Sequence, residues 1–292
     1  MNPYQKLLSR KRKWTPVRTT AGICMDGSQE TLYRVLALRH MELPVGDFIT
    51  DALNNDVPDL ARELLLSNVK DEENHDLALG FIADAYGTDP KAEKEALILR
   101  EAWTSHPDHT ILKAMVAERA IFFVLLPFLR FNGDAGMRTV SADISRDEQV
   151  HVAANSIVCK ELGLSASPSL DKLRKATINW VMEPLGRNTT SKYLDKKFWT
   201  DSSDRLMYEG KAPELSDTRS ARMPAFFEHS NVNLPHTLNL LETKGIQMNA
   251  LVKEMIEVFP PLNPNPSQSH EQIMFQAGQR DVVEWFINKL QD

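Results

Sequence analysis

The chain has 292 residues, 42% of them hydrophobic, which is enough for one large globular domain or two modest ones. Its formal net charge of −6 at pH 7, with a single basic cluster at residues 10–13, disfavours nucleic acid and anionic membranes as partners. No segment reaches the length of about 18 apolar residues that a membrane span needs, and Cys24 and Cys159 have no metal-binding or redox spacing. These features predict a cytoplasmic protein with buried thiols and a solvated basic segment near its start.

Apolar residues recur at spacings of three and four along most of the chain, and strand-like alternation is scarce. Turn-forming sequences such as "NNDVP", "YGTDP", "HPDH", "NGDAG" and "LGLSASPS" interrupt this pattern. The sequence therefore predicts an all-α fold, with helices over 28–53, 57–86, 89–105, 108–131, 135–163 and 168–183.

The last third of the chain is less regular. Prolines interrupt residues 184–234, which fit no single element, and helices are expected to resume over about 235–258. The stretch "FPPLNPNPSQSH", 259–270, has the composition of an exposed linker, and an amphipathic helix is expected after it, to about residue 290. We therefore predict two parts, a helical domain over 1–258 and a linker with a C-terminal helix over 259–292.

Two of the predicted helices contain a glutamate three residues before a histidine. "DEENHD" holds Glu72 and His75, and "RDEQVH" holds Glu148 and His151. On an α-helix, positions i and i+3 lie about 60° apart in azimuth and about 4.5 Å apart in rise, so each pair presents a carboxylate and an imidazole on one face. Such a face can hold a metal ion, although one pair alone is also common on solvated helices.

Glu42 and Glu118 each lie 30 residues before the glutamate of one of these pairs. If each interval folds as a helical hairpin, its two glutamates lie level only when the turn is at the midpoint. The midpoints are Val57, within "NNDVP", and Gly133, within "NGDAG", the strongest turn signals of their intervals. The pattern predicts a ferritin-like four-helix core, with one glutamate from each of two helices and Glu-x-x-His from each of the other two, as in di-metal carboxylate proteins.

Alternatives to this ligand set exist in the sequence. Glu30 could replace Glu42, but it would place the turn near Asp51, within a periodic helix, and Glu73 lacks the one-turn spacing to His75. Acidic faces could also coincide by chance. Buried charges are costly unless they pair or bind metal, which explains charged residues within the apolar run around Glu148. The predicted ligands are therefore Glu42, Glu72, His75, Glu118, Glu148 and His151.

Four carboxylates and two imidazoles are hard oxygen and nitrogen ligands, which suit iron or manganese. The sequence thus predicts two divalent ions per chain. A pair of irons, a manganese/iron pair and a pair of manganese ions all fit this donor set.

The segment "SRDEQVH" resembles the R-D-E-x-x-H helix of the small, radical-generating subunit of class I ribonucleotide reductase. "AERAIFFVLLPF", 117–128, is similar to that family's third ligand helix, and "KRKWTP", 11–16, resembles the Trp-x-Pro segment that precedes its bundle. The resemblance covers roughly residues 10–160, and the arginine–aspartate pair before Glu148 is its most specific part.

This resemblance implies that a di-metal centre, activated by oxygen species, generates an oxidising equivalent for a separate large catalytic subunit that reduces ribonucleotides, as di- or triphosphates. It implies a radical-transfer route through His75, Asp147 and Trp14, with Asp147 hydrogen-bonded to the His75 nitrogen that faces away from the metals. It also implies a homodimer and a C-terminal tail over 259–292 that docks the large subunit. The short length for the family is typical of a trimmed, viral version, which would act in the host cytoplasm.

The sequence departs from the family pattern in two places. Many members carry the radical on a tyrosine seven residues after the second ligand, where this chain has Leu79, and Tyr33 and Tyr86 fit that role poorly. No tyrosine follows Tyr208, so Trp285 is the only evident aromatic substitute for a tail relay. We therefore expect an oxidant that stays on the metals, or another residue or chemistry in place of the tyrosyl radical.

Two other functions use the same ligands. A stand-alone di-metal oxidase or monooxygenase would need neither Trp14, Asp147 nor the tail. A ferritin-type iron-binding protein would typically be shorter than this chain.

Overall fold

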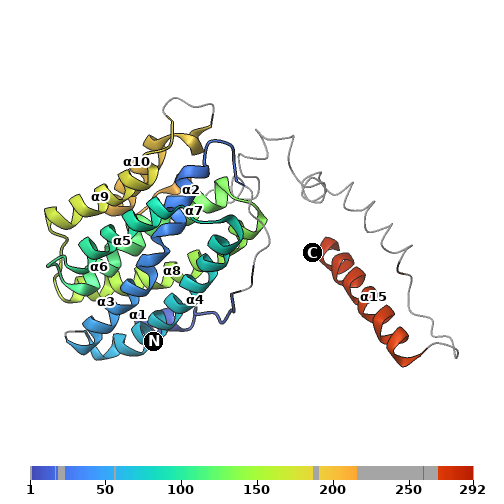
Figure 1. The fold of residues 1–292 in the computed structure, drawn as a ribbon. Helices are drawn as coiled ribbons and strands as arrows, with labels where there is room; N and C mark the ends of the chain where they lie inside the picture. The colour runs from blue at the N-terminus through green and yellow to red at the C-terminus, as the bar shows by residue number, and fades with distance from the viewer. Residues whose placement is uncertain are drawn as a thin grey trace. The chain divides into compact units, whose positions relative to one another are not determined.

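The structure is a computed structural model that describes residues 2–16, 18, 24–55, 57–186, 191–215, 259 and 269–291 (Figure 1). Over these residues the fold is all-α, as predicted, and its one isolated backbone bridge joins Cys24 to Gly133. The helices are α1 (Pro3–Leu8), α2 (Gln29–Ala37), α3 (Glu42–Asn54), α4 (Arg62–Tyr86), α5 (Pro90–Thr104), α6 (Thr110–Ala117), α7 (Phe123–Asn132), α8 (Ala135–Glu161), α9 (Pro168–Met182), α10 (Lys196–Glu209) and α15 (His270–Gln291).

Short turns of other helix types extend several of these helices. A 3-10 turn, Leu38–Met41, joins α2 to α3, and a π-turn, Glu118–Phe122, joins α6 to α7. Further 3-10 turns cover Asp59–Ala61, Lys192–Leu194 and Pro213–Leu215. The chain thus continues through α2–α3 and through α6–α7 as two interrupted helical rods.

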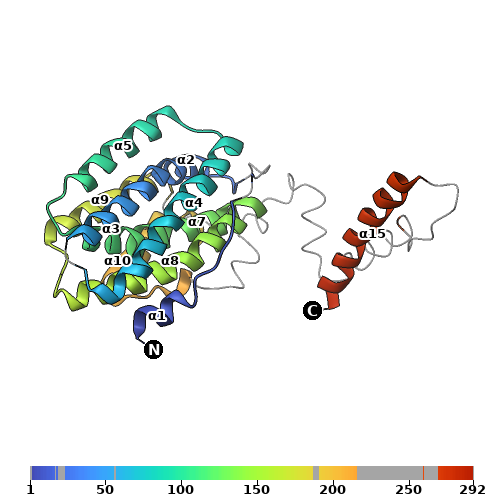
Figure 2. The ribbon, with the colours of Figure 1, turned by 90° about the horizontal axis from the view of Figure 1, so that it is seen from below.

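Four helical segments surround the core of the first part of the chain, namely α3, α4, α8 and the rod formed by α6 and α7. α3 packs against α4 and α6, α4 packs against α8, and α8 packs against α6 and α7 (Figures 1 and 2). Each helix of this set therefore has two neighbours within it, and the inner faces of all four meet. Membership of the ferritin-like class stays a prediction.

Both hairpin turns lie where the glutamate spacing placed them. α3 ends at Asn54 and the next helical turn begins at Asp59, while α7 ends at Asn132 and α8 begins at Ala135. Gly133 is required by close packing, because a Cβ there would lie 2.5 Å from the Leu129 carbonyl oxygen and 2.6 Å from the Met137 side chain.

A second layer covers one side of this core. α9 packs against α10, and both contact the π-turn (Figure 1). The buried Arg174 joins the two helices, since its guanidinium donates to Ser203 Oγ at 2.7 Å and to Asp204 Oδ1 at 2.6 Å. On another side α5 packs against α2.

The chain divides into two compact units, Met1–Ser230 and Asn231–Asp292. The sequence placed this division at residue 258 instead, and both positions lie outside the described residues, so the predicted domain boundary stays a prediction. The helices expected over 235–258 and most of the linker over 259–270 also lie outside them. The expected C-terminal helix is present as α15, whereas α10 lies in a stretch that the sequence left unassigned.

Candidate metal centre

The six predicted ligand residues meet inside the four-helix core. Their ligand atoms form two groups within which every atom lies within 4.8 Å of the others. Glu72 belongs to both groups, so the two share one carboxylate. One group is Glu42, Glu72, His75 and Glu148, and the other is Glu72, Glu118 and His151.

Each helix of the core contributes at a definite position. Glu42 is the first residue of α3, and Glu118 is the first residue of the π-turn. The other four ligand residues lie one turn apart in pairs, within α4 and within α8. π-turns are frequent at functional sites because they interrupt the regular helical register.

The rival residues of the sequence lie elsewhere. Glu30 has a side chain 72% exposed and faces the guanidinium of Arg34 at 3.4 Å. Glu73 is exposed on α4. By contrast, all six predicted ligand residues are at most 1% exposed.

The two histidines direct the same ring nitrogen toward the carboxylates. His75 Nδ1 lies 3.2 Å from Glu148 Oε1, 3.3 Å from Glu72 Oε2 and 3.8 Å from Glu42 Oε2. His151 Nδ1 lies 3.1 Å from Glu72 Oε1, 3.6 Å from Glu118 Oε1 and 3.8 Å from Glu148 Oε1. The ring centroids of the two histidines are 5.6 Å apart.

Among the described residues, these inward-facing atoms have no hydrogen-bond partner. Buried polar atoms are nearly always hydrogen-bonded, so several unpartnered atoms in one place require an explanation. A positive ion between them would provide one, because carboxylate oxygens and an imidazole nitrogen are its normal ligands. The unpartnered atoms are both carboxylate oxygens of Glu42, Glu72 and Glu148, Oε1 of Glu118, and Nδ1 of His75 and His151.

The electrostatics of the cluster also fit a cation. Burial, together with the neighbouring carboxylates, raises the pKa of Glu42 well above its usual value, and burial raises that of Glu118 to about 8. Burial lowers the pKa of His151, but the carboxylates of Glu148, Glu118 and Glu72 outweigh it and raise the pKa to about 9. Burial also raises the pKa of Glu72, but the contacts with His151 and His75 outweigh it and lower the pKa to about 2. The shared carboxylate thus favours positive charge beside it, which protonated histidines or divalent ions can supply. This buried Glu/His cluster can bind a metal ion.

A chain of contacts leads outward from His75. His75 Nε2, which faces away from the cluster, lies 3.4 Å from Asp147 Oδ2. The indole Nε1 of Trp14 donates to the same oxygen at 2.5 Å, and the Trp14 ring stacks on His75 with centroids 6.3 Å apart. Burial raises the pKa of Asp147, but its contacts with His75 and Trp14 outweigh it and lower the pKa. The structure thus brings Trp14 and Asp147 together with His75, as the resemblance implied.

A matching chain of contacts leads outward from His151, and the sequence analysis missed it. His151 Nε2 lies 2.9 Å from Asp71 Oδ2, and Asp71 forms an ion pair with Lys11. Lys11 Nζ also donates to Asn68 Oδ1 at 3.1 Å. The prediction that the basic cluster is solvated is therefore wrong for Lys11, whose side chain is 9% exposed.

A further residue holds one of the candidate ligands. Asn155, one turn after His151 on α8, donates from Nδ2 to Glu118 Oε2 at 2.6 Å. This bond fixes one oxygen of Glu118 and leaves Oε1 directed at the cluster. The spacing of His151 and Asn155, one helical turn apart on the same helix face, was the available signal in the sequence.

The position of the missing tyrosine is filled by a buried leucine. Leu79 is 4% exposed, one turn beyond His75 on α4. Tyr86 instead contacts Cys24 Sγ through its hydroxyl at 3.3 Å and packs its ring on Tyr33.

No family model, curated protein or solved structure matches the chain. Among the described helices, none combines the length and the apolar character of a bilayer-crossing segment.

Proposed function

We propose that the chain is a radical-generating small subunit of a class I ribonucleotide reductase and carries a di-metal centre. The observation that carries this proposal is the unbroken set of contacts from Trp14 through Asp147 to His75. An isolated metal-storage or structural site has no need of an aromatic side chain joined to a ligand in this way.

The ligand atoms fall into two candidate positions for metal ions. Glu42, Glu72, His75 and Glu148 would hold one ion, and Glu72, Glu118 and His151 the other. Four carboxylates balance the charge of two divalent ions when the imidazoles are neutral, so the loaded centre would be neutral in its buried site. Two iron or manganese ions held there would supply a one-electron oxidant by reaction with oxygen species.

The residues outside the centre determine through which side chains this oxidant would take up an electron. Asp147 orients His75 through Nε2 and connects it to the partly exposed indole of Trp14, which can lose an electron. On the other side, the ammonium of Lys11 occupies the corresponding place and cannot be oxidised in this way. The electron would therefore enter along Trp14 and Asp147 toward His75.

The partner would be a large catalytic subunit that reduces ribonucleotides. The tail over 259–292 would dock it, with a homodimer of the small subunit as the working form. α15 belongs to this tail, while the side chains of Trp285 and Phe286 lie outside the described residues. With Leu79 in place of a tyrosine, the oxidant would stay on the metals.

A Trp14→Phe variant tests the proposal. It removes the indole donor to Asp147 but none of the six candidate ligands. We expect metal content to remain at two ions per chain, while nucleotide reduction with the cognate large subunit falls at least about a hundredfold, as expected when a required step loses about 3 kcal/mol. Full reductase activity in this variant would contradict the proposal.

Deletion of residues 260–292 separates the proposed function from a stand-alone oxidase. The reductase subunit should keep its metals and lose activity with the large subunit, whereas a stand-alone oxidase should retain most of its turnover. Oxygen consumption in the absence of any partner is the second readout.

A further inference from the structure

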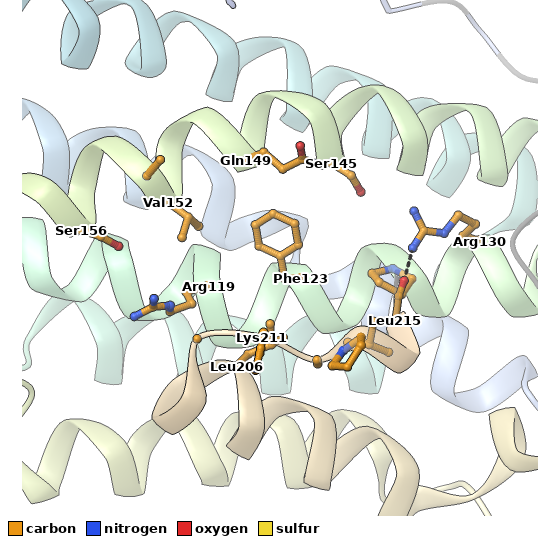
Figure 3. Close-up of a pocket in the computed structure, with 15 residues that line it drawn as sticks. Arg119, Phe123, Arg130, Ser145, Gln149, Val152, Ser156, Leu206, Lys211 and Leu215 are labelled. Atoms are coloured by element: carbon orange, nitrogen blue, oxygen red, sulfur yellow. Dashed lines mark hydrogen bonds between the residues drawn. The ribbon is translucent and has the colours of Figure 1, made fainter. Parts of the chain in front are cut away.

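A cavity of about 820 Å³ lies beside α7 and α8, on the side where residues 210–215 follow α10 (Figure 3). Its volume is within the range of about 300–1,000 Å³ that is usual for small-molecule sites. Arg119 and Gln149 line it, and each directly follows a candidate ligand, Glu118 and Glu148 respectively. The cavity therefore lies on other faces of the helices that supply the metal centre.

The charged residues among the described lining are all positive. They are Arg119, Arg130 and Lys211, and the described lining includes no aspartate or glutamate. Arg119 contacts the Met115 sulfur at 3.9 Å, and Arg130 donates from Nη2 to the Leu215 carbonyl oxygen at 2.6 Å. Within the described part of the chain, neither arginine is paired with a carboxylate.

Several polar atoms of the lining lack partners. Arg130 Nε and the hydroxyls of Ser145 and Ser156 are buried without a hydrogen bond among the described residues. Ser145 is only 7% exposed, and burial lowers the pKa of Arg130. A buried donor without a partner is unfavourable, so this part of the lining favours a ligand that accepts hydrogen bonds over a purely apolar one.

The middle of the cavity is apolar. Figure 3 shows the Phe123 ring projecting toward α8, with Arg119 and Arg130 at opposite ends of the cavity. Val152 and Leu206 complete the apolar part around the ring. A ligand that fits must combine an apolar body with a negative group near one end.

We propose that this cavity is a binding site for a small organic anion, whose apolar body packs on Phe123 and whose negative group is held by Arg119 or Arg130 with Lys211. This site is distinct from the metal centre, and its occupation does not depend on the proposed reductase function.

The test uses the full chain and the fluorescent organic anion anilinonaphthalene sulfonate. We expect saturable binding at one site per chain, displaced by phenyl phosphate. Benzyl alcohol, which has the apolar body without the charge, and inorganic phosphate, which has the charge without the body, should each compete at least about tenfold more weakly, since each lacks one part of the interaction.

Variants locate the binding in the cavity. Arg119→Gln, Arg130→Gln and Lys211→Gln each remove one charge. Replacing the arginine that holds the negative group should weaken the binding of phenyl phosphate at least about tenfold. Ala153→Leu fills the cavity without changing its charge and should block binding. Lys197→Gln, an exposed lysine of α10 outside the cavity, is the matched control and should bind as the unaltered chain does. Melting temperatures identify any variant that fails to fold, and Lys211 is exposed enough to replace safely.

Three results would overturn the proposal. The first is the absence of displaceable binding to the full chain. The second is equal competition by benzyl alcohol or by inorganic phosphate. The third is unchanged binding in folded Ala153→Leu or in all of the folded charge variants.

Discussion

His75 and His151 each turn Nδ1 toward the carboxylates and present Nε2 to an aspartate of the opposite helix. Asp147 of α8 contacts His75 of α4, and Asp71 of α4 contacts His151 of α8. Each aspartate directly precedes a candidate ligand, so the motif Asp-Glu-x-x-His occurs twice. The aspartate of each copy contacts the histidine of the other copy. The two halves of the centre are built on the same local pattern.

The difference between the halves comes from the segment before the bundle. Residues 11 and 14 both reach the aspartates, but Trp14 donates to Asp147 while Lys11 forms an ion pair with Asp71. An indole can be oxidised by one electron, whereas an ammonium group contributes only charge. One short segment therefore makes a symmetric pair of ligand helices chemically asymmetric, and it accounts for a single electron route in the proposed function.

The largest expected effect comes from removing a ligand on either side. Both His75→Ala and His151→Ala should reduce the metal content from the proposed two ions per chain to one or none, and Glu118→Ala should do the same, because each variant removes one of the three or four candidate ligands of a group. Elemental analysis of the purified variants measures this. Glu73→Ala, an exposed neighbour, is the control; two bound ions in the histidine variants would show that the assignment is wrong.

The next effect is a change in the stability of the fold that depends on the Lys11 side of the centre. Lys11→Met removes the ammonium partner of Asp71 and leaves His151 as its remaining partner, which should lower the free energy of unfolding by about 2 kcal/mol in metal-free protein. Denaturant unfolding measures the change. Lys13→Met, at an exposed position two residues later, should change it by less than about 0.5 kcal/mol. Equal stability of the two variants would mean that the Lys11–Asp71 contact contributes nothing.

A smaller effect distinguishes the aspartates by function. Asp71→Asn and Asp147→Asn should each weaken metal binding by about 10–100-fold, since each alters a partner of a candidate ligand histidine. At saturating metal, however, only Asp147→Asn should impair activity with the proposed large subunit, because among the described contacts of the two aspartates only that of Asp147 reaches an aromatic ring. Titration of metal and the reductase assay are both needed. Comparable activity of the two metal-loaded variants would show that the two halves of the centre do not differ in function.

The sequence was sufficient to predict the four core segments and the convergence of the six buried residues. The reason is local and periodic: Glu-x-x-His fixes one helix face, and a turn at Val57 or Gly133 sets the level at which two helices meet. Glu30 was set aside on the same ground and is exposed in the structure.

The contacts around the cluster were harder to predict because they depend on tertiary packing. Lys11 lies in a run of four basic residues, which has the composition of a solvated segment, and its partner Asp71 is 60 residues away. The signal for Asp71 was present, since it precedes Glu72 as Asp147 precedes Glu148, but the family resemblance covered only the second motif. α10 was missed because prolines on both sides of it masked the helical pattern.

The most direct test is anomalous diffraction at the iron and manganese edges from crystals of the metal-loaded chain. Two peaks are expected, one near His75 and one near His151, with Glu72 in contact with both. Anomalous density outside this cluster, or none within it after loading, would contradict the assignment of these six side chains as ligands.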